Sequence, residues 1–200
     1  MRKKNKQADC VRCVRKSCYQ GKDCFGFRDQ SQRSYSSEDL KITREATQIE
    51  SEHYMKMTRL EEVILFCRNM SYTRLGIAFC IGLSDEAKTV AELLEPYFEI
   101  VSVCCKICGI PKEKFNLPKI DSTRDESMCN PLGQALHLNN AQTDLNLIVG
   151  LCIGHDILFT KNSAAPVSTL IVKDRVLGHN PAAAIYSGYH RKRIAKSVKI

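Results

Sequence analysis

The sequence predicts an α/β protein, a three-layer sandwich with a mostly parallel sheet of about four or five strands, preceded by a small cysteine-rich metal-binding segment. Beyond residue 74, apolar strand-like runs alternate with helical segments, which is typical of a parallel sheet covered on both faces. Before residue 38, four cysteines lie among many charges with little apolar periodicity. We therefore expect a metal-binding segment and linker over 1–37, and an α/β domain over 38–200 with a cysteine-lined site at the carboxyl ends of its strands.

A polar run and a long helical pattern come first. The run over 28–39 predicts a linker that ends in a helix cap near Ser37. The helix is expected to span 38–70, where the strongest apolar stripe has i, i+3, i+4, i+7 spacing. This stripe consists of Leu60, Val63, Ile64 and Cys67. Cys67 is therefore expected to be a small buried side chain.

Strands and capped helices follow one another through the rest of the chain. The predicted strands are 74–82, 99–108, 144–154 and 167–174. The predicted helices are 84–98, 130–141, 156–163 and 180–196. Ser84 is expected to cap the first of these helices and Asn130 the second, with Pro131 in its first turn. Asn180 and Pro181 repeat that helix start.

The distribution of charge argues against a nucleic-acid-binding protein. The net charge is +8, but residues 1–6 and 189–200 carry nine Lys and Arg and no acids, which leaves 21 basic and 22 acidic residues elsewhere. Such basic ends are typical of solvated tails. No apolar run reaches the roughly 18 residues of a membrane helix. The charged N-terminus has no apolar stretch behind it, so we expect a cytoplasmic protein.

Cysteines stand where three predicted strands end. Cys80 and Cys152 occupy the same position in the related runs "AFCIG" and "GLCIG", and Cys104, Cys105 and Cys108 end the strand between them. Ligands of parallel sheets bind outside the carboxyl ends of the strands. Cys104 and Cys105 point to opposite faces of a strand, so we expect one of them to reach the site, and we favour Cys105 for that role. Cys129 comes just before a predicted helix, whose dipole favours a thiolate. The predicted cofactor-binding set is therefore Cys80, Cys105, Cys129 and Cys152.

The N-terminal cysteines predict a second metal site. Cys10, Cys13, Cys18 and Cys24 have C-x2-C-x4-C-x5-C spacing, and a C-x2-C pair can hold one ion. Four thiolates suit tetrahedral zinc or an iron–sulfur cluster. A segment this polar has little core, so metal binding would supply its folding free energy.

Polar residues near the strand ends are candidates for catalysis. They are Lys106, His155, Asp156, Arg175 and His179. His155 is a candidate ligand, acid–base group or donor to a cluster sulfide. Asp156 is equally well explained as the cap of the next helix. The positive side chains Lys106 and Arg175 would bind a small anionic substrate.

The motifs "AFCIGL", "CCK", "MCNPLGQA", "GLCIGHDILF" and "KDRVLGHNP" resemble an uncharacterised prokaryotic family described as metal-binding. The resemblance covers nearly the whole chain. It implies a metal-associated protein, frequent in anaerobes, and implies no known reaction. Through these motifs it points to Cys80, Cys105, Cys129, Cys152, His155 and His179.

Three functions remain open, and the sequence does not decide whether the protein is an enzyme. The first is an iron–sulfur protein, with a [4Fe–4S] cluster and a redox or sulfur-handling role that involves a small anionic substrate or a redox partner. The second is a non-catalytic zinc adaptor or metal carrier. The third is a thiol oxidoreductase that uses Cys105 and Cys108, although this C-x-x-C does not open a helix.

Overall fold

The computed structural model describes residues 9–197, and the chain divides into two compact units between Arg44 and Glu45. In the first unit a short 3-10 turn, Ser17–Gln20, precedes α1, Arg28–Ser34, and the beginning of α2, Ser37–His53. No residue over 9–44 is buried. Within this stretch, therefore, hydrogen bonds rather than a hydrophobic core organise the chain.

Helix α1 corrects the prediction that residues 28–39 form an irregular linker. The carboxylate of Asp23 accepts hydrogen bonds from the N–H groups of Gly26 and Arg28, at 2.8 and 3.0 Å. These bonds hold the turn immediately before the helix. The polarity of the segment does not by itself indicate that a helix starts there. The next helix begins at the predicted place, since Ser36 and Asp39 hydrogen-bond each other's N–H groups around the start of α2.

The second unit contains a four-stranded sheet with helices around it. Its strands are β1 Arg74–Phe79, β2 Glu99–Cys104, β3 Leu145–Val149 and β4 Val167–Ile171. Its helices are the end of α2, then α3 Arg59–Asn69, α4 Ser84–Leu94, α5 Pro131–Asn140, α6 His155–Asn162, α7 Ala182–Tyr186 and α8 Gly188–Ser197. Short 3-10 turns lie at Ile81–Leu83, Ile107–Gly109 and Lys112–Phe115.

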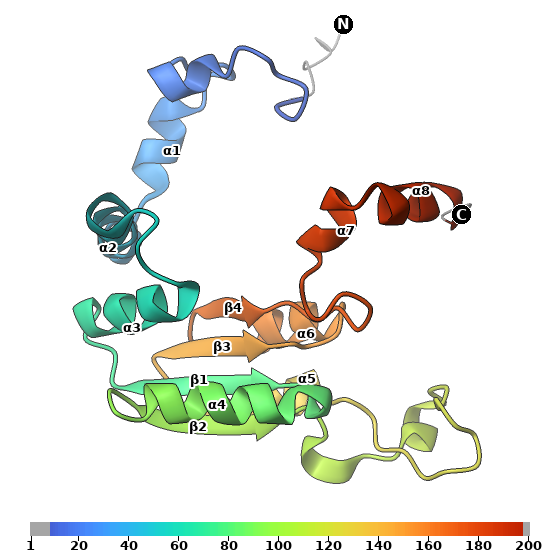
Figure 1. Ribbon diagram of the computed structural model, residues 1–200. Helices are drawn as coiled ribbons and strands as arrows, with labels where there is room; N and C mark the ends of the chain where they lie inside the picture. The colour runs from blue at the N-terminus through green and yellow to red at the C-terminus, as the bar shows by residue number, and fades with distance from the viewer. Residues whose placement is uncertain (1–8, 198–200) are drawn as a thin grey trace, which may run out of the picture. The chain divides into compact units, whose positions relative to one another are not determined.

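The predicted α/β class and parallel sheet are confirmed. The strand order is β2-β1-β3-β4, and every pair is parallel. Figure 1 shows α4 in front of the sheet and α5 and α6 behind it. The chain leaves β1 towards β2 on one side, whereas β3 leads to β4 on the other. The carboxyl ends of β1 and β3 therefore flank the switch point at which such sheets bind ligands.

Three predicted helices differ from the structure at their boundaries. The helix expected over 38–70 is two helices, because the chain turns at Met55, whose φ is +57°. Ser84 does not cap α4, since its hydroxyl donates to the Ile81 carbonyl. The helix expected over 180–196 is split at Ser187, and Asn180 makes no side-chain cap. Asn130 does cap α5, accepting from the Gly133 N–H at 2.8 Å.

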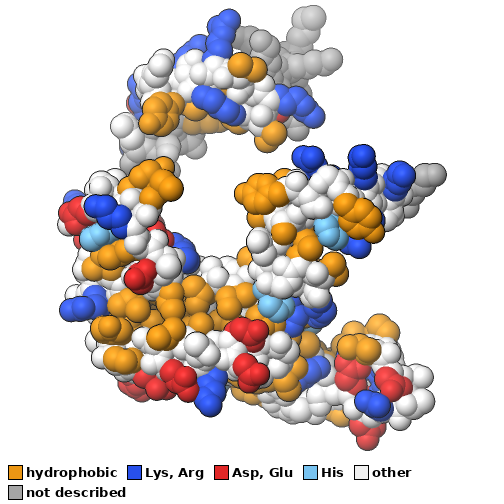
Figure 2. Space-filling model, viewed as in Figure 1, with side chains coloured by type: hydrophobic (Ala, Val, Ile, Leu, Met, Phe, Trp, Pro, Cys, Tyr) orange, Lys and Arg blue, Asp and Glu red, His pale blue; other side chains and the backbone are white. Residues whose placement is uncertain are grey.

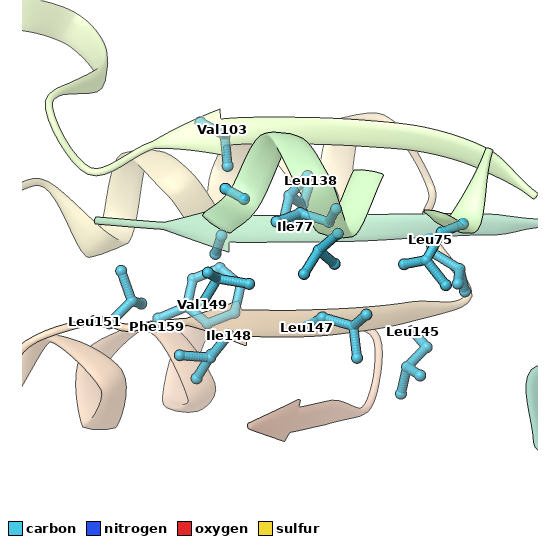
Figure 3. Packing of buried hydrophobic residues seen from close by; sticks show 14 of the residues in the cluster. Leu75, Ile77, Val103, Leu138, Leu145, Leu147, Ile148, Val149, Leu151 and Phe159 are labelled. Carbon is cyan, nitrogen blue, oxygen red and sulfur yellow. The ribbon is translucent and has the colours of Figure 1, made fainter. Parts of the chain in front are cut away.

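Aliphatic side chains of the two central strands form the centre of the core. Leu75 and Ile77 from β1, Leu147 from β3 and Leu138 from α5 are fully buried and appear among the labelled side chains of Figure 3. Cys67 belongs to the same cluster, as predicted, and burial raises the pKa of its thiol to about 12. This cysteine is therefore a core side chain.

A buried polar network crosses the sheet next to a glycine. The side chain of Asn146 accepts from the Thr143 hydroxyl at 2.7 Å and donates to the Ser163 hydroxyl at 2.8 Å. A Cβ atom at Gly76 would lie 1.9 Å from Asn146 Oδ1. Glycine at this position of β1 therefore leaves the space that the network needs.

Replacing Thr58 by alanine is expected to destabilise α3. Thr58 and Glu61 form a capping box, in which each side chain accepts a hydrogen bond from the other's N–H. We expect the free energy of unfolding to fall by about 1 kcal/mol in urea denaturation. Thr89→Ala, on α4, is a matched control because Thr89 is exposed and caps no helix. An equal loss in both variants would contradict the role of the cap.

The C-terminal helix carries a row of cations on its surface. Arg191, Lys192, Arg193 and Lys196 of α8 are exposed, and Figure 2 shows blue side chains along this segment. The basic residues predicted as a tail at 1–6 lie outside the described residues. Over 9–197, no helix has the length and apolar character to cross a bilayer.

Candidate functional site

Three cysteines meet at the carboxyl edge of the sheet because the backbone brings them there. Cys80 follows β1, and its N–H donates to the Val149 carbonyl at 3.1 Å. Cys105 follows β2, and its N–H donates to the Phe79 carbonyl at 2.8 Å. Its own carbonyl accepts the Asn130 N–H at 2.7 Å, which holds Cys129 beside it. Backbone hydrogen bonds of the kind that pair the strands thus continue past the strand ends and hold these cysteines near one another.

The three side chains influence one another through Cys105. It interacts electrostatically with both Cys80 and Cys129, and its sulfur accepts the Ile81 N–H at 3.4 Å. Cys105 is almost completely buried, and Cys80 is buried as well. We call Cys80, Cys105 and Cys129 the thiol cluster. Its members come from three separate segments, so the fold, and no local motif, creates it.

A lysine crosses the sheet edge to reach this cluster. Lys173 follows β4, and its Nζ lies 2.7 Å from Cys80 Sγ. Because β3 stands between β4 and β1, this contact joins segments that follow two strands that are not neighbours. A Cβ atom at Gly82 would lie 3.3 Å from this Nζ, so glycine leaves room for the ammonium group. The thiol cluster therefore has a positive group in direct contact.

The contacts set unequal pKa values for the three thiols. The hydrogen bond from Cys105, together with Lys173, lowers the pKa of Cys80 to about 4. The hydrogen bond from Cys105 also lowers the pKa of Cys129 to about 6, with Lys106 and His155 adding positive charge. The same two bonds, with Cys129 first and Cys80 second, raise the pKa of Cys105. The three thiols therefore differ in acidity: the pKa values of Cys80 and Cys129 are lowered, and that of Cys105 is raised.

Cys80 is expected to be a thiolate at pH 6 in the metal-free protein. Its pKa lies below that pH, whereas a thiol with the ordinary pKa of 9.0 is still protonated. Ultraviolet thiolate absorbance at pH 6 should be lower in Cys80→Ala than in the wild type. Lys173→Ala should raise the pKa and shift the loss of absorbance to higher pH. Equal absorbance at pH 6 in the wild type and Cys80→Ala would contradict this charge state.

Cys152 occupies the same edge but has a different partner. Arg175 donates from Nη2 to Cys152 Sγ at 3.0 Å. The Cys152 carbonyl accepts the N–H groups of His155 and Asp156, at 2.9 and 3.2 Å, which closes the turn before α6. Over residues 9–197, no hydrogen bond joins the Cys152 thiol to a member of the thiol cluster. Cys152 therefore has Arg175 as its side-chain partner at this edge.

The other predicted catalytic residues have different surroundings. Lys106 donates to the Ser127 carbonyl and adds positive charge near Cys129, as does His155. The Asp156 carboxylate accepts the N–H groups of Gly154 and Ile157, at 2.9 and 2.8 Å, and so shapes the start of α6. His179 Nδ1 accepts the Asp174 N–H at 3.2 Å and closes the loop after β4. Lys106, His155 and Arg175 thus lie nearest to the cysteines.

Gln134 and Lys173 support the site without being prominent in the sequence. Gln134 is fully buried on α5, and its Nε2 donates to the Val103 and Phe79 carbonyls at 2.9 and 3.2 Å. It thereby holds the ends of β2 and β1 just before Cys105 and Cys80. The sequence does indicate Lys173 as a candidate, since it follows the fourth predicted strand at the same edge. Nothing in the pattern distinguishes Gln134.

The N-terminal cysteines remain separate from each other. Cys10, Cys13, Cys18 and Cys24 are all exposed, and the Cys13 N–H donates to the Cys10 carbonyl at 3.3 Å. Within the described part of the chain, no group of three or more His, Cys, Asp or Glu side chains is spaced to hold a metal ion as it stands. Any metal binding would therefore involve movement of these side chains.

The chain is similar to proteins without an assigned activity. A family model described as "Protein of unknown function (DUF1847)" matches residues 21–170. An uncharacterized protein of Methanocaldococcus jannaschii is 55% identical over 189 residues, which cover 92% of this chain and 97% of that protein. No solved structure matches the chain. The matched range includes Cys80, Cys105, Cys129 and Cys152, whereas Lys173 and Arg175 lie beyond it.

Proposed function

Because the chain belongs to the family described as "Protein of unknown function (DUF1847)", whose description names no activity, we propose a function from the thiol cluster. The protein binds a thiolate-ligated metal centre, an iron–sulfur cluster, at the carboxyl edge of its sheet. It uses this centre in a redox or sulfur-handling role. The observation that supports the proposal is the gathering of Cys80, Cys105 and Cys129 at one edge of the sheet, with Lys173 Nζ 2.7 Å from Cys80 Sγ.

The chemistry of the side chains fits such a centre. Thiolates select soft metals and are the common ligands of iron–sulfur clusters and of zinc. Within residues 9–197, no three such side chains are spaced to hold a metal ion as they stand, so the thiols would have to move to bind one. A modest rearrangement of side chains would convert the hydrogen-bonded cluster into ligands. An iron–sulfur cluster would supply electron transfer or a Lewis-acidic iron at this edge.

Positive groups around the cluster would offset the charge of a thiolate centre. Lys173 contacts Cys80, and Lys106 and His155 lower the pKa of Cys129. Hydrogen bonds to cluster sulfurs and nearby charges tune the reduction potential of iron–sulfur proteins. In the proposed role, His155 donates a proton, and Lys106 and Arg175 bind a small anionic substrate. Asp156 and His179 hold the loops that position these residues.

We propose a second metal site on Cys10, Cys13, Cys18 and Cys24. Because residues 9–44 have no buried side chain, a metal would supply the folding free energy that a hydrophobic core does not. Zinc and an iron–sulfur cluster both suit four thiolates.

Anaerobic purification followed by metal analysis tests the main proposal. The full chain should be treated with iron and sulfide, both as the wild type and as the Cys10→Ser/Cys13→Ser variant, which removes the exposed N-terminal pair. We expect iron, acid-labile sulfide and visible absorption in both proteins. A colourless, iron-free variant would overturn the iron–sulfur proposal for the sheet edge. Stoichiometric zinc without colour would instead support a zinc adaptor or carrier.

The geometry gives less support to a thiol oxidoreductase at Cys105 and Cys108. The Cys105 thiol contacts Cys80 and Cys129, while Cys108 is exposed in a left-handed turn with φ of +70°. A disulfide that forms rapidly between Cys105 and Cys108 in metal-free protein would favour this function.

A further inference from the structure

We propose that Cys80 and Cys105 are an oxidation site, at which hydrogen peroxide converts the two thiols into a reversible disulfide bond. The inference goes beyond the proposed function and does not depend on it, because it concerns the thiols of the protein freed of metal. It rests on the backbone register of two neighbouring strands, on the position of one sulfur atom and on the burial of both side chains.

The strand register makes Cys80 and Cys105 direct neighbours. The pairing of β1 with β2 ends at Phe79 and Cys104, one residue before this pair. The backbone of Cys80 stays extended, with φ of −82° and ψ of 139°. The Cys105 N–H donates to the Phe79 carbonyl at 2.8 Å, as it would in a longer parallel ladder. The register therefore continues for one more residue, and Cys80 is the partner of Cys105.

The sulfur of Cys105 lies against the backbone that follows Cys80. In a ladder that continued further, the Ile81 N–H would donate to the Cys105 carbonyl. That carbonyl instead accepts the Asn130 N–H at 2.7 Å, and the Ile81 N–H donates to Cys105 Sγ at 3.4 Å. The Cys105 thiol is therefore turned towards the end of β1, where Cys80 lies.

Neighbouring strands are spaced for a disulfide bond. Strands lie about 4.7–4.9 Å apart in the hydrogen-bonding direction, and disulfides join residues whose Cα atoms are about 4.4–6.8 Å apart. Side chains alternate between the faces of a sheet, so the register partners Cys80 and Cys105 share a face and Cys104 belongs to the other. A change of side-chain rotamer can thus join Cys80 to Cys105 without movement of the strands.

Burial selects a small oxidant. The Cys80 residue is 6% exposed and the Cys105 residue 2% exposed, so a bulky disulfide such as oxidised glutathione does not reach their sulfur atoms. Hydrogen peroxide has only two heavy atoms and requires a much smaller opening. Cys108, in contrast, is exposed and open to larger oxidants. The chemical class of the oxidant therefore follows from the burial of the pair.

The oxidation proceeds in two steps. The Cys80 sulfur attacks one peroxide oxygen, an S–O bond forms and the O–O bond breaks, and the other oxygen leaves as water with the thiol proton. Lys173 Nζ, 2.7 Å from Cys80 Sγ, is placed to donate a hydrogen bond to that departing oxygen. The Cys105 sulfur then attacks the sulfenic sulfur, the S–S bond forms and the S–O bond breaks, and a second water leaves with the Cys105 proton. Two thiols thus lose two electrons and two protons, and one peroxide becomes two waters.

Peptide mapping of the oxidised full chain tests the proposal. The protein is freed of metal with a chelator, treated with hydrogen peroxide, alkylated and digested with trypsin. Cys80 is the one cysteine of fragment 75–88, Cys104 and Cys105 share fragment 89–106, and Cys108 lies in fragment 107–112. We expect fragments 75–88 and 89–106 to be joined by a disulfide that dithiothreitol reverses. Any other disulfide of Cys80 or Cys105, or Cys80 left as a thiol or oxidised to a sulfinic acid, would overturn the proposal.

Cys104→Ser is the matched control, because it changes the adjacent cysteine on the other face of the strand. The bond between fragments 75–88 and 89–106 should persist in Cys104→Ser and be absent from Cys105→Ser. A bond that survives in Cys105→Ser would assign the link to Cys104, and the proposal would be wrong.

Oxidised glutathione tests the class of oxidant. At the same concentration it should modify Cys108 and leave Cys80 as a free thiol. If it links Cys80 to Cys105 as fast as hydrogen peroxide does, burial does not select the oxidant and that part of the proposal is wrong. Since the protein is freed of metal in these experiments, their outcome is separate from that of the iron and sulfide measurements, which test the proposed function.

Discussion

Replacing Cys80 by serine is expected to abolish metal binding at the edge of the sheet. Cys80 Sγ lies 2.7 Å from the Lys173 ammonium, and its pKa is lowered to about 4, so its thiolate forms readily. A serine hydroxyl is harder and remains protonated at neutral pH, and two thiolates then remain for the metal. Iron and labile sulfide should fall to background in reconstituted Cys10→Ser/Cys13→Ser protein that carries this substitution.

Cys104→Ser and Cys108→Ser separate loss of a ligand from general loss of thiols. Cys104 ends β2 and Cys108 lies in the following turn, and no hydrogen bond of the described residues joins either thiol to the cluster. Both variants should keep their iron. Circular dichroism and urea denaturation should show that Cys80→Ser remains folded. A folded Cys80→Ser protein with normal iron and visible absorption would show that the thiol cluster is not the binding site.

Replacing Phe159 by alanine is expected to cause the largest loss of stability. Phe159 is fully buried on α6 and belongs to the core cluster with Ile148 and Leu151. Removing the ring leaves a cavity that the rigid sheet cannot fill, so the free energy of unfolding should fall by about 3–5 kcal/mol. Urea denaturation of the metal-free protein measures this loss.

Ile157→Ala is the matched control on the same helix. Its side chain is 61% exposed, so its truncation should change the free energy of unfolding by less than about 0.5 kcal/mol. Because α6 begins at His155, three residues after Cys152, metal content should be measured in both variants. Similar stabilities for Phe159→Ala and Ile157→Ala would contradict the packing in Figure 3.

Some local features were predictable in detail, and others were missed although the sequence contains their signal. Asn130 and Pro131 predicted the start of α5 because a capping side chain acts within one turn. The break between α2 and α3 was not predicted, yet Thr58 and Glu61 have the spacing of a capping box. Apolar periodicity continued across the break and outweighed this signal. Helix α1 had no comparable signal, since Asp23 organises its start from five residues away.

The sequence by itself determined the class of fold and the edge at which the cysteines lie. Alternating strands and helices favour a parallel sheet, and a residue that follows a strand must lie at that strand's carboxyl end. The strand order, the contact of Cys105 with Cys80 and Cys129, and the separate pairing of Cys152 with Arg175 were decided by tertiary structure. Lys173 and Cys80 are 93 residues apart, and only the packing of strands brings them together. Local propensity acts over a few residues, whereas these contacts depend on which strands are neighbours and on which side chains reach across them.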